Sequence, residues 1–117
     1  MRRLVVLATL LALAPVTAFA HAQLVRTVPP VGATVRSAPP EIVLSFSEPV
    51  EAALSTLELR DGAGKKLEGG APRVGGDGRQ LAIAIGTLPP GPYKVVWKVT
   101  SIDSHTTQGD FTFQVAP

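Results

Sequence analysis

The chain has no cysteine, and its only methionine is Met1. Without cysteine it can form no disulfide, thiolate nucleophile, thiolate zinc site or cysteine-ligated blue-copper centre. Because Met1 leaves with the leader described below, the remaining chain has no sulfur ligand of any kind. A metal bound by this chain must therefore be held by nitrogen and oxygen atoms.

Long runs of like charge are also absent, and the longest basic run is Lys65-Lys66. The chain has 11 Lys and Arg against nine Asp and Glu, and its formal net charge of +2 comes from Arg2 and Arg3 in the leader. The rest of the chain is close to neutral. This distribution gives no basic surface for nucleic acid or for an anionic membrane.

Catalytic motifs are missing as well. The sequence has no G-x-S-x-G, no H-E-x-x-H and no glycine-rich phosphate loop, and Ser104 and His105 are sequence neighbours, which gives no triad geometry. An enzyme is not expected.

The only long apolar run lies at residues 4–14, after a positive start and before the small residues Ala18-Phe19-Ala20. This order predicts a secretory signal peptide over residues 1–20, cleaved before His21, and hence a periplasmic domain over residues 21–117. The run is shorter than the roughly 20 residues that span a bilayer. An uncleaved N-terminal anchor is the alternative.

The segments after residue 20 alternate apolar and polar residues and are separated by proline and glycine turns, with no convincing helical period. Ile42, Leu44 and Phe46 share one face, and Trp97 should be the largest core residue. We expect an all-β, antiparallel Greek-key sandwich or small barrel. The predicted strands are 22–28, at an edge, then 41–47, 54–60, 65–67, 81–85, 93–100 and 109–115, with an exposed, unstructured loop at 69–78 and a polar loop at 101–108.

Cleavage before His21 would give one residue two metal ligands. The new α-amine and the ring Nδ1 can close a six-membered chelate ring on a single ion. Asp103 and His105 lie two residues apart, so in an extended segment both side chains project to the same side and could complete the site. An amine, two imidazoles and a carboxylate suit tetragonal Cu(II), with zinc or nickel bound more weakly.

Each of these residues also has a plain structural interpretation. The two histidines can be solvent-exposed polar residues, and Asp103 can be a turn residue that bonds its own backbone. Glu48 lies two residues after Phe46. If the strand continued that far, both side chains would share a face and the Glu48 carboxylate would point toward the apolar side. It can equally be a solvated group at a strand end.

Several stretches of the chain resemble the CopC-like periplasmic copper-resistance proteins. They are HAQL at residues 21–24, PPVGA at 29–33, LSFSEPV at 44–50 and PYKVVWKVTSIDSH at 92–105, followed by Gly109 and FTF at 111–113. Together they cover essentially all of residues 21–117.

The resemblance implies a cupredoxin-like barrel of immunoglobulin-like topology without a blue-copper site. It implies that His21, Asp103 and His105 hold Cu(II), with Glu48 as a weak axial ligand or an outer partner of the N-terminal amine. Some members carry a methionine-rich loop with a further histidine for Cu(I), and this chain has neither. The implied protein is a monomeric Cu(II) carrier that works beside a CopD-like inner-membrane protein.

Two other functions are compatible with parts of the sequence. Residues 30–33 and 42–50 also resemble the opening of bacterial immunoglobulin-like surface modules, which bind no metal, although such modules usually come in arrays. An N-terminal histidine with a second histidine is also the copper brace of polysaccharide monooxygenases. Those enzymes need a larger scaffold with a broad, flat binding face. Most of the few aromatic residues here occupy alternating positions that are expected to face the core.

Overall fold

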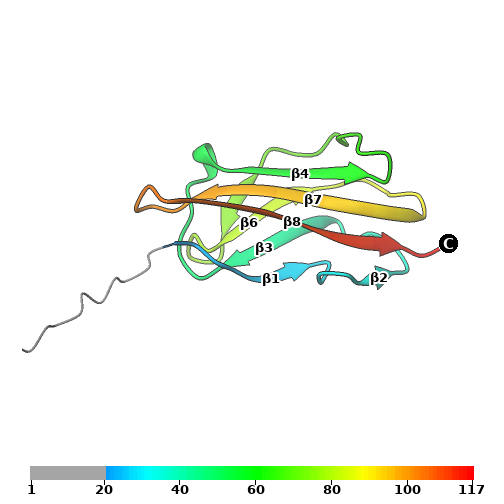
Figure 1. Ribbon diagram of the computed structural model, residues 1–117, viewed down its shortest axis with the longest axis horizontal. Helices are drawn as coiled ribbons and strands as arrows, with labels where there is room; N and C mark the ends of the chain where they lie inside the picture. The colour runs from blue at the N-terminus through cyan, green and yellow to red at the C-terminus, as the bar shows by residue number, and fades with distance from the viewer. Residues whose placement is uncertain (1–20) are drawn as a thin grey trace, which may run out of the picture.

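The computed structural model describes residues 21–117 and shows two four-stranded β-sheets packed face to face (Figure 1). The predicted signal peptide lies outside the described residues. The first sheet has the order β1-β3-β6-β5 and the second has the order β2-β8-β7-β4. The strands are β1 (Leu24–Val28), β2 (Thr34–Val35), β3 (Glu41–Phe46), β4 (Thr56–Asp61), β5 (Arg73–Gly75), β6 (Gln80–Ala84), β7 (Gly91–Thr100) and β8 (Thr106–Val115).

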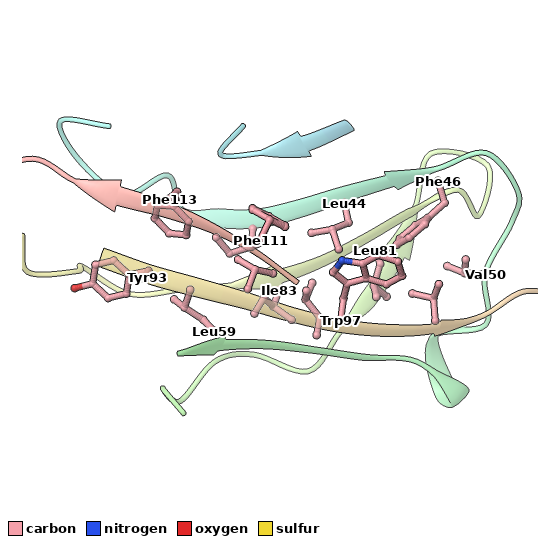
Figure 2. Packing of buried hydrophobic residues seen from close by; sticks show 14 of the residues in the cluster. Leu44, Phe46, Val50, Leu59, Leu81, Ile83, Tyr93, Trp97, Phe111 and Phe113 are labelled. Atoms are coloured by element: carbon pink, nitrogen blue, oxygen red, sulfur yellow. The ribbon is translucent and has the colours of Figure 1, made fainter. Parts of the chain in front are cut away.

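The alternating residues form the core that the sequence predicts. In β3 the buried side chains are Ile42, Leu44 and Phe46, and in β7 they are Tyr93, Val95, Trp97 and Val99. Figure 2 shows Leu44, Phe46, Tyr93 and Trp97 between the sheets together with Phe111 and Phe113 of β8. Burying one face of each strand fixes its register, since a slip of one residue would expose every core side chain.

The all-β prediction is confirmed, and β1 is an edge strand as expected. The only helix among residues 21–117 is the three-residue 3₁₀ turn η1 (Ala52–Leu54). No helix in this part of the chain has the length and apolar character needed to cross a membrane.

Three expectations of local structure were wrong. The glycine-rich loop at 69–78 contains β5, which pairs with β6 through Val74 and Leu81. β8 begins at Thr106 rather than at residue 109, because its first residues pair with the end of β7. The two residues of β2 pair in parallel with β8, so the sheets are not wholly antiparallel.

The predicted return strand at 65–67 is reduced to a single bridge between Arg60 and Lys66. The preceding turn is fixed by Asp61, whose Oδ1 accepts hydrogen bonds from the backbone N–H groups of Ala63 and Lys65 at 2.9 and 3.0 Å. The expected hairpin is therefore present, with a shorter second arm.

The β7–β8 hairpin matters most for the site. Both strands are ten residues long, and their register runs from Gly91 opposite Val115 to Thr100 opposite Thr106. The tip of this hairpin, residues 101–105, lies at the end of the sandwich where residue 21 enters, and the C-terminus lies at the opposite end (Figure 1). Residue 21 and the hairpin tip, which are far apart in the sequence, therefore meet at one end of the molecule.

Candidate metal centre

The structure brings His21 and His105 into direct contact. Their ring centroids are 4.6 Å apart and the rings meet edge to face at 73°. His21 is half-buried, whereas the His105 side chain is 56% exposed. Two imidazoles from distant parts of the sequence thus lie together, with one of them open to solvent.

The hairpin tip that carries His105 is a tight turn. Its ends are joined by the bond from the Ser101 N–H to the His105 carbonyl at 2.9 Å, and Ser104 has a left-handed backbone with φ of 75°. The prediction that Asp103 and His105 share one side of an extended segment was therefore wrong in its geometry. The turn nevertheless places the two side chains together.

Asp103 contacts His105 through both of its carboxylate oxygens. Its Oδ2 lies 3.1 Å from His105 Nδ1, and its Oδ1 accepts the His105 backbone N–H at 3.2 Å. The second bond is the aspartate turn that the plain structural interpretation expected. The turn and the contact with the imidazole are therefore parts of one arrangement.

This contact fixes which imidazole nitrogen can face a metal. Because His105 Nδ1 is directed at Asp103, Nε2 is the nitrogen left for coordination. Histidines that bind metals commonly direct their other ring nitrogen at a carboxylate, which sets the ring orientation and its basicity. The geometry of Asp103 suits this supporting role, and its direct coordination of the ion stays a prediction.

Ser101 holds Asp103 in turn. The Ser101 hydroxyl donates to Asp103 Oδ1 and also lies 3.2 Å from the His105 carbonyl. The Ser101 hydrogen bond is the main reason that the pKa of Asp103 falls from 3.8 to about 2. Partial desolvation opposes the shift and the contacts with His105 add to it, so the carboxylate is ionised at neutral pH.

Glu48 is not drawn into this group. β3 ends at Phe46, so the continued strand that would aim the Glu48 carboxylate inward is absent. Within residues 21–117, no hydrogen bond or ion pair joins Glu48 to His21, Asp103 or His105. A role for Glu48 at the metal stays a prediction.

The described residues contain no set of three or more His, Asp or Glu side chains already arranged around one point. In the full chain the His21 nitrogen is an amide, bonded to Ala20, and cannot serve as the amine ligand. The two histidines and the carboxylate fit a nitrogen- and oxygen-bound ion, but the fourth donor appears only when the bond before His21 is cut.

Hydroxyl groups around the site were missed by sequence reasoning. Thr107 Oγ1 donates to the Ala22 carbonyl at 2.8 Å, and Ser47 Oγ accepts the Gln23 N–H at 2.9 Å. Serine and threonine commonly bond nearby backbone groups, but pairing across the fold leaves no pattern in sequence spacing.

Comparison with known proteins identifies relatives of this chain. Residues 24–116 match the CopC domain. The chain is 37% identical over 99 residues to Protein YobA of Escherichia coli K12, covering 83% of this chain and 80% of YobA. It is 36% identical over 110 residues to Copper resistance protein C of Xanthomonas campestris pv. juglandis, covering 88% of this chain and 86% of that protein.

A longer relative is Copper transport protein CutJ of Bacillus subtilis, which is 26% identical over 113 residues. The match covers 95% of this chain but only 21% of CutJ.

Two solved structures share the fold. The crystal structure of CopC from Methylosinus trichosporium OB3b superposes with a TM-score of 0.78 at 31% identity, covering 83% of this chain and 95% of that one. PcoC from Escherichia coli, described as a methionine-rich copper resistance protein, gives a TM-score of 0.72 at 29% identity. The match covers 82% of this chain and 99% of PcoC.

Proposed function

This chain belongs to the CopC family, and on that premise we propose that it is an exported Cu(II)-binding protein that sequesters or delivers copper. Proteins of this family bind copper and are not enzymes, and they are typically periplasmic. This membership argues against the alternatives of a metal-free immunoglobulin-like module and of a copper oxygenase.

The observation that carries the proposal is the contact between His21 and His105. After cleavage, the His21 amine and imidazole would form one chelate, and His105 Nε2 would add a third nitrogen from the hairpin tip. Asp103 would orient His105 and could supply an oxygen ligand, with Glu48 as the weak outer donor. Copper(II) stands at the head of the divalent affinity order and favours such a tetragonal nitrogen and oxygen set.

The composition supports a site for Cu(II) alone. Soft thiolate and thioether ligands select Cu(I), and residues 21–117 contain neither. The relative PcoC is described as methionine rich, and this chain departs from it in that respect. We therefore propose no Cu(I) site and no shuttling of copper between two sites within the domain.

A membrane protein is proposed as the partner. This chain matches about a fifth of the length of the copper transport protein CutJ, so a domain of this kind forms part of a larger transport protein there. We propose that the present protein acts as a monomer beside a separate CopD-like inner-membrane protein.

The test compares two forms of residues 21–117, one beginning at His21 and one with a single glycine added ahead of it. The first should bind one Cu(II) tightly and show nitrogen-rich tetragonal EPR features. The extension moves the amine away from the imidazole and should weaken binding. Full affinity in the glycine-extended form, with its circular dichroism unchanged, would rule out the N-terminal chelate.

Mass spectrometry of the exported protein supplies the companion measurement. The proposal expects His21 as the first residue. Cleavage one residue to either side would remove the chelate, so any other mature N-terminus found in all of the exported protein contradicts the assignment.

A further inference from the structure

The backbone that follows His21 is held on both sides by hydroxyl groups, one from β8 and one from the residue after β3. Thr107 Oγ1 donates to the Ala22 carbonyl at 2.8 Å. Ser47 Oγ accepts the Gln23 N–H at 2.9 Å and lies 3.4 Å from the His21 carbonyl. A backbone bond from the Ser47 N–H to the Gln23 carbonyl at 2.8 Å completes the attachment.

Ala22 is also buried, with 1% of its surface exposed, and it belongs to the hydrophobic core. The first residue of the described chain is thus only half-buried, whereas the second is fixed in the sandwich. Ahead of β1, the backbone of Ala22 and Gln23 is therefore fixed in the fold directly after His21.

Thr107 links this attachment to the hairpin that carries the other histidine. It lies in β8 opposite Val99, two residues after His105. The bond from Thr107 to Ala22 therefore ties the backbone beside one histidine to the backbone beside the other. Since both strands of the hairpin are paired over their full length, this bond joins His21 to a rigid element.

We propose that Thr107 is a positioning residue for the copper site, which keeps the His21 chelate within reach of the ion bound by His105. The inference rests on the proposed function, because it concerns how that same site is assembled. A free N-terminal residue would have to be ordered when copper binds, and the cost of that ordering would lower the affinity. A residue already held in place avoids this loss.

Position 107 needs a side chain that can donate a hydrogen bond. The γ-hydroxyl donates the bond, so serine should substitute for threonine. Valine has nearly the same shape as threonine but no hydrogen-bond donor. It would leave the Ala22 carbonyl without the hydrogen bond from position 107.

The test measures Cu(II) binding to residues 21–117 of the Thr107→Val variant by competition with a chelator of known affinity. Removal of a partner that orients a ligand typically weakens metal binding about 10- to 100-fold, and the same loss is expected here. Thr107→Ser should restore the affinity. The matched control is Thr106→Val, because Thr106 is the preceding residue of β8 and its hydroxyl pairs with Thr100 rather than with the N-terminal segment.

Two further measurements separate positioning from a general loss of stability. The copper-induced rise in melting temperature should shrink in Thr107→Val more than in the control, because copper would no longer join the N-terminal segment to the hairpin. The EPR spectrum should move toward fewer nitrogen ligands. If Thr107→Val fails to fold, Ser47→Ala removes the other hydroxyl and should give the same losses.

An affinity for Thr107→Val within about twofold of the wild type, with the same melting shift, would overturn the inference, given the losses usual for such partners. Failure of Thr107→Ser to restore binding would overturn it too. These results are distinct from failure of the proposed function, in which the wild-type protein itself would bind no Cu(II) tightly.

Discussion

Asp103 shows how one side chain can belong to both a turn and a candidate metal site. Its carboxylate takes bonds from the Ser101 hydroxyl and from the His105 backbone while facing the His105 ring. The turn interpretation and the ligand interpretation of this residue were alternatives at the level of sequence. In the structure the turn bond is what places the imidazole beside the carboxylate.

The ionised form of Asp103 should stabilise the copper-free fold in a defined pH range. Its folded-state pKa, about 2, lies below the ordinary aspartate value of 3.8, so the stabilisation is present above about pH 4 and is lost as the pH falls toward 2. Asp103→Asn should therefore melt below the wild type at pH 6, and the gap should close near pH 2.

Thermal melts of both proteins at a series of pH values, without copper, check this prediction. Asp110→Asn is a suitable control, because Asp110 is an exposed carboxylate on the same hairpin. A gap that stays constant from pH 6 to pH 2 would contradict the ionised role of Asp103.

The residues of the candidate site were predictable because their chemistry is rare in this chain. With two histidines and no sulfur, the choice of nitrogen ligands was small. Ser101, Ser47 and Thr107 could not be chosen in this way, because the sequence holds many hydroxyl residues. Their importance depends on which strands meet, which only the three-dimensional structure shows.

At the scale of elements, the strands with strict alternation were predicted well and the short ones were not. β3 and β7 each bury every second residue, so the pattern identifies them directly. β2 and β5 have only two and three residues, too few to display a period, and they exist because a longer neighbour offers a free edge. Pairing with a neighbour is not visible in local sequence.

Gly109 illustrates an element-level constraint within β8. It pairs with Trp97, and a Cβ at this position would lie 2.7 Å from Cζ2 of the indole ring. Trp97 in turn packs edge to face on Phe46, with ring centroids 5.4 Å apart, and so cannot easily move away. Figure 2 shows the two rings next to each other. Gly109→Ala should destabilise the fold by about 1–3 kcal/mol, the usual cost of overpacking a core.

Urea denaturation of the copper-free protein measures this effect. Gly75→Ala is the matched control, because Gly75 also lies in a strand and a Cβ there would meet no atom within 4 Å. The control should be close to neutral. Equal stability of the two variants would show that Trp97 can move aside.

At the scale of the whole molecule, the candidate site joins the start of the described sequence to the tip of the β7–β8 hairpin. His21 lies ahead of the edge strand β1 in one sheet, and His105 lies at the tip of the hairpin in the other sheet. An ion bound by both would hold the sheets together at this end. Copper should therefore act on the global stability rather than on one loop.

Saturating Cu(II) should raise the melting temperature of residues 21–117. A ligand that binds only the folded state stabilises it by about 2.7 kcal/mol when its free concentration is 100 times its Kd. For a domain of this size, each kcal/mol corresponds to about 4–8 °C. Differential scanning calorimetry with and without copper measures the shift.

His105→Ala should lose most of that shift, because the remaining nitrogen ligands would both belong to His21. Gln108→Ala, at an exposed position further along β8, should keep it. A full copper-induced shift in His105→Ala would show that copper does not bridge the hairpin and the N-terminus.

The burial of Ala22 also bears on the order of events during biogenesis. A protease must reach the backbone around the bond that it cuts. Ala22 is the second residue after the proposed cut, and in the folded domain it is buried in the core and its carbonyl accepts the Thr107 hydroxyl. Export and proteolysis should therefore come first and folding second, so that a precursor allowed to fold early would shield its own processing site and never acquire its copper ligand.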